Sequence, residues 1–217
     1  MDVLIEELKQ KPNLKILVNE LTQILQEEEQ RRMEFYNHIS ESDKAEFING
    51  EVIMHSPAKR EHLGVTGLLF SLMHYYAIMK KCGSVFTEKA MIQLTRNSYE
   101  PDIVFFKKAK ADAFTPGQML FPAPDLIVEV VSPSTEKYDR GIKFTDYALH
   151  GVSEYWIVDP AQKSAEQYFL QGDAYVLEFK GKTGSITSKA IADFTIPVQA
   201  VFDETENMKV LQQIMQA

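Results

Sequence analysis

The stretch LIVEVV, residues 126–131, places one carboxylate inside an otherwise aliphatic run, and this feature constrains the chain most. A short apolar run of this kind, preceded by Pro124 and followed by the sequence SPST, is typical of a strand that is buried on both faces. Glu129 lies in the middle of the run. Because an unpaired buried charge is very costly, the side chain must be paired, protonated or bound to a metal ion.

The composition is that of an ordinary globular protein. The chain has 217 residues, of which 45% are hydrophobic and 25% charged, which suits one domain with a sizeable core. No apolar run is long enough to span a membrane, the acidic N-terminus lacks a signal-peptide pattern, and the single Cys82 excludes an internal disulfide. We therefore expect a cytoplasmic protein without a membrane partner. The net charge of −8 argues against a protein that coats nucleic acid, but it allows an enzyme with a local basic rim.

Hydrophobic periodicity predicts an N-terminal helical arm over residues 1–44, with Asn13 as a helix cap. The Asn49-Gly50 pair predicts a hairpin over residues 45–56. The further expected elements are a largely buried helix over 58–80, strands over 84–94, 99–107, 125–132 and 154–159, a loop over 108–124, a helix over 137–149, a hairpin over 165–179 and a helical tail over 206–217.

Hairpin-linked strands followed by a crossover helix give a mixed sheet with helices on its faces. We therefore expect an α/β fold, of the α+β mixed-sheet kind. Its core domain would cover residues 45–205, with the order helix, strand, strand, strand, helix, strand, between the arm and the tail.

Two carboxylates stand on separate strands of this expected sheet. Asp102 opens the sequence PDIVFF, and if its strand lies beside that of Glu129, both side chains can point to one spot. Two oxygen ligands suit Mg²⁺ or Mn²⁺. Lys143 follows on a helix, with Asp139 and Tyr147 one turn away on the same face. Spacing alone leaves plainer alternatives open, because Pro-Asp often only punctuates a strand and a buried Glu often pairs with a buried Lys.

Longer motifs resemble a known family. A Pro-Asp pair in one strand, a carboxylate within the next and a lysine after it resemble the PD-(D/E)XK nuclease superfamily. The motifs EVVSPST, DRGIKFTDY and GVSEYWIVD, with INGEVIMHSP and the pair Glu61-His62, resemble specifically its Uma-type family, over roughly residues 45–205.

The resemblance implies a restriction-endonuclease-like fold and a Mg²⁺-dependent endonuclease acting on DNA, with Mn²⁺ able to replace Mg²⁺. It implies that Asp102 and Glu129 hold the metal, that the Val130 carbonyl is a third ligand and that Lys143 is the active-site lysine. The sequence departs from the plain E-x-K pattern, because Val131 stands where that lysine would be. The helix-borne Lys143 would take its place.

Four residues are accessory candidates, and each has a structural alternative. Glu88 is either a further acidic ligand or a solvated edge residue, and Glu51 either points to the site or is a solvated residue beside the hairpin turn. His62 either positions water or phosphate or is a hydrogen-bonded core histidine. Tyr147 would pack and donate to a carboxylate or a phosphate.

The leading prediction is therefore a DNA endonuclease. The alternative is a non-catalytic interaction or nucleic-acid-binding protein that retains the nuclease fold, against which the complete set of Asp102, Glu129 and Lys143 argues. A glycosidase with paired carboxylates would give no role to Lys143. Because enzymes that cut both strands commonly pair two sites about a two-fold axis, we expect a homodimer, with the arm over 13–36 and the hairpin over 165–179 as candidate surfaces.

Overall fold

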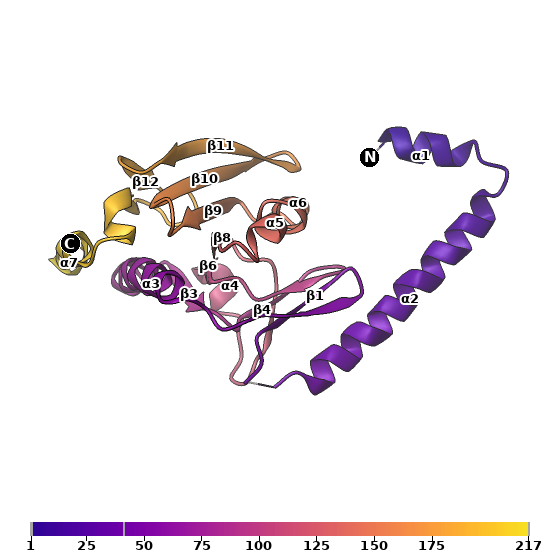
Figure 1. Cartoon of the computed structure of the whole chain (residues 1–217), viewed down its shortest axis with the longest axis horizontal. Coiled ribbons are helices and arrows are strands. Elements are labelled where there is room, and N and C mark those ends of the chain that lie inside the picture. The colour runs from indigo at the N-terminus through magenta and orange to yellow at the C-terminus, as the bar shows by residue number, and fades with distance from the viewer. Residues whose placement is uncertain (1, 41, 217) are drawn as a thin grey trace. The chain divides into compact units, whose positions relative to one another are not determined.

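The computed structural model in Figure 1 describes residues 2–40 and 42–216. The contacts between residues divide the chain into two compact units, Met1–His55 and Ser56–Ala217. The hairpin that follows the arm thus belongs to the same unit as the arm. No helix in the described part of the chain is long and apolar enough to cross a lipid bilayer.

The first unit consists of the helical arm and one hairpin. Its elements are α1 (Asp2–Lys9), α2 (Leu14–His38), β1 (Ala45–Ile48) and β2 (Glu51–Met54). Asn49 and Gly50 both have positive φ, 51° and 83°, as a two-residue hairpin turn requires. A Cβ at Gly50 would lie 2.9 Å from side-chain atoms of both Glu28 and Arg31, so glycine also permits the turn to approach α2.

The second unit is built around a six-stranded sheet. Its elements are α3 (Arg60–Lys80), β3 (Gly83–Thr87), β4 (Met91–Gln93), β5 (Ser98–Tyr99), β6 (Ile103–Lys107), α4 (Lys108–Ala111), β7 (Leu120–Phe121), β8 (Leu126–Val130), α5 (Glu136–Asp139), α6 (Ile142–Leu149), β9 (Glu154–Asp159), β10 (Ser164–Gln171), β11 (Ala174–Gly181), β12 (Ser185–Thr187), β13 (Thr195–Pro197), the 3-10 helix η1 (Val198–Val201) and α7 (Glu204–Gln216).

The strand order of the large sheet is β11-β10-β9-β8-β6-β3. The neighbours β8 and β9 are parallel, whereas the β6–β8, β3–β6, β9–β10 and β10–β11 pairs are antiparallel. The predicted α/β fold with a mixed sheet is therefore confirmed.

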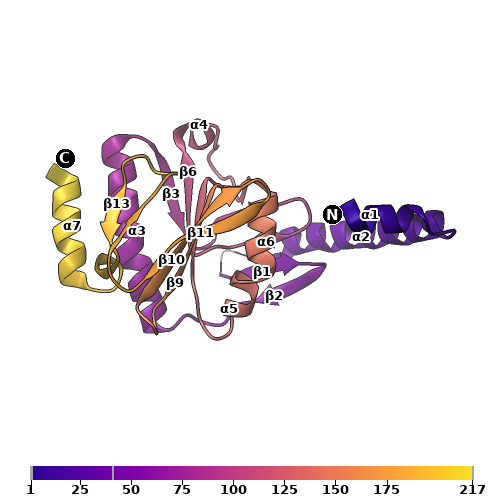
Figure 2. The same cartoon turned by 90° about the horizontal axis from the view of Figure 1, so that it is seen from above.

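Helices cover both faces of this sheet, as Figure 2 shows for α3 and α6. On one face Leu69 and Leu72 of α3 belong to a buried cluster with Val128 of β8, and α7 packs along α3. On the other face the rings of Phe144 and Tyr147 of α6 contact Tyr155 of β9. The face that carries α6 is also the face to which Glu129 points.

Several predicted elements are interrupted. The strand expected over residues 84–94 is broken at Glu88 and Lys89, whose φ values of 40° and 50° do not fit a strand. The helix expected over residues 137–149 is divided into α5 and α6 near Gly141, and the expected loop over 108–124 contains α4 and β7. The helix α3 buries one face only, because Leu63, Tyr75, Ile78 and Met79 are exposed.

Candidate active site

Asp102 and Glu129 are brought together by strand register. Ile103 of β6 pairs with Val128 of β8 in the antiparallel sense, so Asp102 stands opposite Glu129, one step beyond the described pairing. Directly opposed residues point to the same face of a sheet. Both side chains are buried, with 5% of Asp102 and 3% of Glu129 exposed. The amide of Val130 donates a hydrogen bond of 2.8 Å to Asp102 Oδ2, which fixes one carboxylate to the strand of the other.

Two side chains of α6 converge on Glu129. Lys143 Nζ lies 3.1 Å from Glu129 Oε1 and 3.3 Å from Asp139 Oδ1. The hydroxyl of Tyr147 donates to the same Glu129 oxygen over 2.9 Å. Only 3% of Lys143 is exposed. A single lysine thus bridges two buried carboxylates, and the hydrogen bond from Tyr147 fixes the orientation of Glu129.

His62, in the first turn of α3, reaches Asp102 from another element. Its Nε2 lies 3.1 Å from Asp102 Oδ1. Because Oδ2 accepts from Val130, the Asp102 carboxylate is held at both oxygens. His62 is therefore placed to orient Asp102.

The break between α5 and α6 positions the lysine. A Cβ on Gly141 would lie 2.6 Å from the carbonyl oxygen of Lys137, so a larger residue does not fit there without a backbone shift. The chain turns at this glycine, and Asp139 before it and Lys143 after it meet at 3.3 Å. Farther along α6, Asp146 accepts hydrogen bonds of 2.8 Å from Asn97 and Tyr99, which tie the helix to the segment around β5.

The site has an excess of negative charge. Burial raises the pKa of Tyr155 well above its ordinary value, and the carboxylates of Glu129, Asp139 and Asp102 raise it further. Buried carboxylates are stable only when cations or hydrogen-bond donors compensate them. Lys143 and the hydrogen bonds to Asp102 and Glu129 contribute to this compensation.

The donor set fits one particular kind of metal ion. Within residues 2–40 and 42–216, no group of three or more His, Cys, Asp or Glu side chains is arranged to hold a metal. Two opposed carboxylates remain, and these suit Mg²⁺, which commonly takes one or two carboxylates and keeps several water ligands. Each carboxylate has about four acceptor sites, so a metal can add to the hydrogen bonds already made.

The accessory candidates have different places. The backbone N–H of Glu88 donates to the carbonyl of Asp102 over 3.1 Å, which puts its backbone beside the site. Glu51 lies at the start of β2 in the first unit and is exposed. Val130 is 1% exposed, and its amide binds Asp102 as described above.

Sequence reasoning placed Asp139 on the same helix face as Lys143 but gave it no role, and it did not single out Asp146. The spacing of Asp139 and Lys143, four residues apart on a helical pattern, was a usable signal for the first. Asp146 had no such signal, because Asn97 and Tyr99 meet it only in the folded chain.

The mixed sheet with helices on both faces defines an α/β protein, and its two opposed carboxylates and buried lysine lie on one face of that sheet. A family model described as "Uma2: Putative restriction endonuclease" matches residues 28–199. Since this match covers most of the chain, the protein belongs to that family, and the predicted family is confirmed.

The known proteins that are similar to this chain include the following two. One is sll1609 of Synechocystis sp. (strain ATCC 27184 / PCC 6803 / Kazusa), described as uncharacterized, which is 28% identical over 151 residues, or 67% of this chain and 84% of that protein. The other is the crystal structure of a "putative nuclease belonging to DUF820" from Anabaena variabilis, with a TM-score of 0.67 and 18% identity, covering 80% of this chain and 96% of that one. At this identity, the structural match shows the fold alone.

Proposed function

We propose that the protein is a metal-dependent endonuclease that hydrolyses phosphodiester bonds of DNA. One observation carries the proposal: Asp102 and Glu129 are opposed on adjacent strands, and Lys143 contacts Glu129 at 3.1 Å. Membership of the family described as "Putative restriction endonuclease" supports the same reaction class.

Asp102 and Glu129 would hold Mg²⁺, with the carbonyl of Val130 as a third protein ligand and Mn²⁺ able to substitute. When bound, such an ion lowers the pKa of a coordinated water and offsets charge on the phosphate. The chain itself supplies the alignment, since His62 and the Val130 amide hold Asp102 and Tyr147 holds Glu129.

Lys143 would bring a positive charge to the proposed site. Its ammonium group donates a hydrogen bond to Glu129 Oε1 over 3.1 Å and forms an ion pair with Asp139 Oδ1 at 3.3 Å. A substrate phosphate or the attacking water would be attracted by this positive charge. Lys143 would then stabilise the charge that develops during hydrolysis, as positioned cations do in phosphoryl transfer.

A second function is favoured by one feature of the same network. Lys143 already bridges two carboxylates, which is also what a purely structural counter-ion would do. On this alternative, the protein is a non-catalytic interaction or nucleic-acid-binding protein that retains the fold. The two functions differ in whether removal of one carboxylate changes DNA cleavage.

The test is conversion of supercoiled plasmid DNA, followed on gels with Mg²⁺, Mn²⁺ or EDTA. We expect cleavage with either metal, none with EDTA, and a loss of roughly 100-fold or more in Glu129→Gln, because one ligand is weakened. The matched control is Glu178→Gln, which alters an exposed glutamate of β11 and should cleave normally. Equal activity of the two variants, or a wild type without activity under every metal condition, would favour the non-catalytic alternative.

We further propose that the enzyme works in the cytoplasm as a homodimer, because a duplex presents two antiparallel strands to be cut. The hairpin of β10 and β11 exposes Val176 and Leu177, and the arm exposes a larger apolar set. Of these two candidate dimer surfaces, the arm has the more regular spacing of exposed apolar residues.

A further inference from the structure

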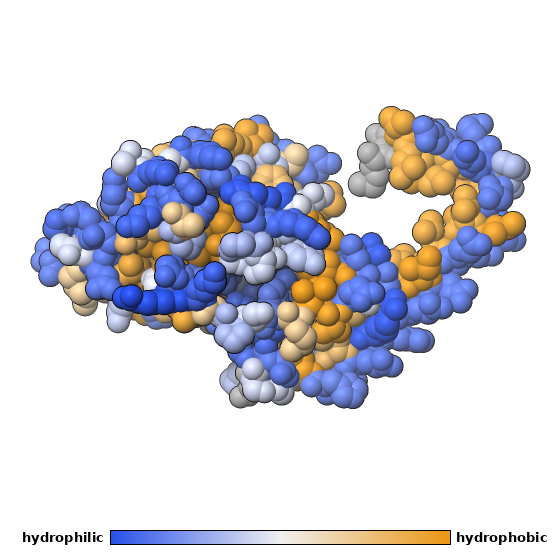
Figure 3. Space-filling model, in the orientation of Figure 1, coloured by the Kyte–Doolittle hydropathy of each residue, from blue (hydrophilic) through white to orange (hydrophobic). Residues whose placement is uncertain are grey.

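One face of α2 carries apolar residues at coiled-coil spacing. Leu14, Leu17, Leu21 and Ile24 follow each other at alternating intervals of three and four residues. Val18 and Leu25 lie beside them, and we call these six residues the α2 seam. Val18, Leu21, Ile24 and Leu25 are 46% to 53% exposed. Figure 3 shows hydrophobic residues gathered along the arm.

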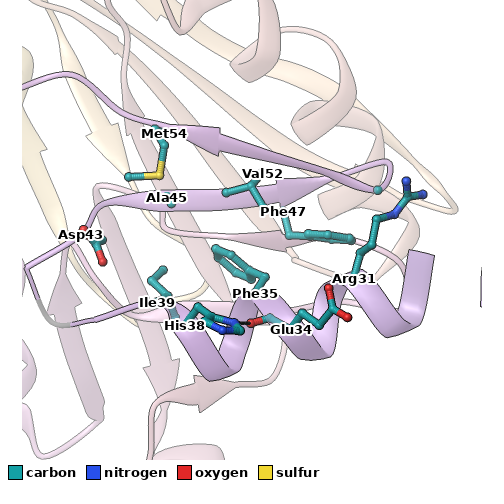
Figure 4. A pocket seen from close by; sticks show the side chains of 11 residues that line it. Arg31, Glu34, Phe35, His38, Ile39, Asp43, Ala45, Phe47, Val52 and Met54 are labelled. Atoms are coloured by element: carbon teal, nitrogen blue, oxygen red, sulfur yellow. Dashed lines mark hydrogen bonds between the residues drawn. The ribbon is translucent and has the colours of Figure 1, made fainter. Parts of the chain in front are cut away.

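The same spacing continues into a part of α2 that is covered. Its next positions are Glu28, Arg31 and Phe35. Arg31 is exposed, whereas Glu28 and Phe35 are buried, and the ring of Phe35 lies 5.9 Å from that of Phe47 in β1. Between this half of α2 and the hairpin lies a cavity of about 450 Å³, lined in part by Phe35, Phe47, Val52 and Met54 (Figure 4). The hairpin therefore contacts the C-terminal half of this helix face, and the seam is the half that the hairpin leaves uncovered, with Leu14 and Leu17 half-buried and the other four residues exposed.

Charge along the arm is divided at the middle of the seam. Residues 9–19 contain three lysines, Lys9, Lys11 and Lys15, and no acidic residue. Residues 20–29 contain four glutamates and no basic residue. A fitting partner is a helix with an equal apolar stripe and the opposite order of charges. The same helix, running in the reverse direction, meets both conditions.

We propose that two copies of the chain associate through antiparallel pairing of their α2 seams. In this pairing, Leu14 packs on Ile24 of the second copy and Leu17 packs on its Leu21. The basic segment of each copy lies along the acidic segment of the other. The pairing is isologous, as two-fold symmetry requires.

The hairpin explains why the pairing is antiparallel. In a parallel pair, both hairpins would stand at the same height on the facing sides, beside Glu28 and Phe35, and would hold the helices apart. In the antiparallel pair, α2 of the second copy begins at Leu14, opposite Ile24. The N-terminus of that helix therefore lies just before the part of the first α2 that the hairpin covers. The helices pair over residues 14–24, which is the part of α2 that the hairpin leaves uncovered.

The oligomeric state of the full chain, measured by sedimentation over a range of concentrations, tests this inference without reference to nuclease activity. We expect a dimer whose dissociation constant rises at least about 100-fold in Leu21→Glu. The pairing contains two Leu17–Leu21 contacts, and in the variant each of them would have to bury a carboxylate. Met33→Glu is the matched control, since Met33 is 49% exposed on the same helix but off the seam. It should dimerise normally. A monomeric wild type, or a Leu21→Glu variant that still dimerises, would overturn the proposal.

Charge reversal at low ionic strength tests the orientation. Lys11→Glu with Lys15→Glu should weaken the dimer about 10-fold, because acidic segments would then face each other. Adding Glu27→Lys and Glu29→Lys should restore much of the affinity. In a parallel dimer, the first pair of changes would relieve repulsion between like lysines, so an unchanged or tighter dimer would exclude the antiparallel arrangement. Circular dichroism of each variant checks that α2 remains helical.

Discussion

Asp102 accepts a hydrogen bond of 2.8 Å from the amide of Val130, the residue that follows Glu129, and the two carboxylates thus stand opposite each other on β6 and β8. Their positions are coupled through the backbone of the sheet. Since like charges so close raise each other's energy, the fold has to supply compensating groups. Lys143 from α6 and His62 from α3 are those groups, and each comes from a different element.

Lys143→Met should abolish plasmid cleavage and destabilise the metal-free protein. The variant leaves Glu129 and Asp139 without their shared cation, and breaking a buried ion pair in this way typically costs about 3–5 kcal/mol. Cleavage should fall by roughly 100- to 10,000-fold if the ammonium group stabilises the reacting phosphate. Melting temperature and plasmid nicking, each with and without Mg²⁺, measure the two effects separately.

Lys137→Met, which alters an exposed lysine of α5, is the control for the lysine variant. It should melt and cleave like the wild type. If Lys143→Met regains stability with Mg²⁺ and also nicks DNA at a normal rate, Lys143 is a structural counter-ion, and its proposed catalytic role is wrong.

Tyr147→Phe should slow cleavage mildly. The variant removes the 2.9 Å hydrogen bond to Glu129 but keeps the ring that packs between Tyr99 and Tyr155. We expect a stability loss of about 1–2 kcal/mol and up to roughly 10-fold slower cleavage, because Glu129 becomes less well oriented.

Tyr175→Phe is the control for Tyr147→Phe, because it also removes one hydrogen-bonded tyrosine hydroxyl. It loses a 2.8 Å hydrogen bond to the Val152 carbonyl, so it should cost similar stability. Its cleavage rate should not change. Equal rate losses in the two variants would mean that Tyr147 acts on stability alone.

Gly141→Ala should impair both folding stability and activity. The added Cβ meets the Lys137 carbonyl at 2.6 Å, and relief requires a shift of the segment that carries Asp139 and Lys143. We expect a loss of about 1–3 kcal/mol by overpacking. Gly67→Ala, in α3, where a Cβ meets nothing within 4 Å and φ is not positive, separates the crowding from the general effect of losing a glycine. A normal melting temperature and normal cleavage in Gly141→Ala would show that the turn tolerates a side chain.

The sequence allowed the fold class and the family to be predicted, because both depend on local patterns. The apolar run around Glu129 marked a central strand, and Asn49-Gly50 marked a hairpin turn by its need for positive φ. Interruptions were harder to predict. At Glu88 and Lys89 the residue types give no warning of left-handed backbone, because tertiary contacts decide it there.

The candidate site was predictable in part for the same reason. The alternation of side chains along a strand predicted that Asp102 and Glu129 point to one face of the sheet, provided that their strands were neighbours. The contact of His62 with Asp102 depends on the position of the first turn of α3 in the folded chain, and no local sequence pattern specifies that position. The functional roles of all these residues stay predictions until the variants are measured.

Acid should weaken the attachment of the segment between α5 and α6 to the sheet, through Glu166 of β10. Arg140 donates two hydrogen bonds to this carboxylate, at 2.9 and 3.0 Å, and Lys180 Nζ lies 3.0 Å away. Burial alone would raise the pKa of Glu166, but the hydrogen bonds from Arg140, Tyr168 and Lys180 outweigh it and lower the pKa to about 2. Since the folded-state pKa lies below the ordinary value of 4.5, the carboxylate stabilises the fold above that value.

Glu166→Gln should therefore be less stable than the wild type at neutral pH, by roughly 1–3 kcal/mol after allowance for the partly exposed Arg140 and Lys180. The difference in unfolding free energy should shrink as the pH falls from about 4.5 towards about 2, because the wild-type carboxylate becomes protonated there. Urea unfolding of both proteins across this pH range measures the difference in unfolding free energy. The contributions of the other titrating carboxylates cancel in this difference, because both proteins contain them. Glu178→Gln, at an exposed position of β11, should stay close to the wild type throughout. A difference between wild type and Glu166→Gln that stays constant with pH would mean that Arg140 holds the segment by packing and not by charge.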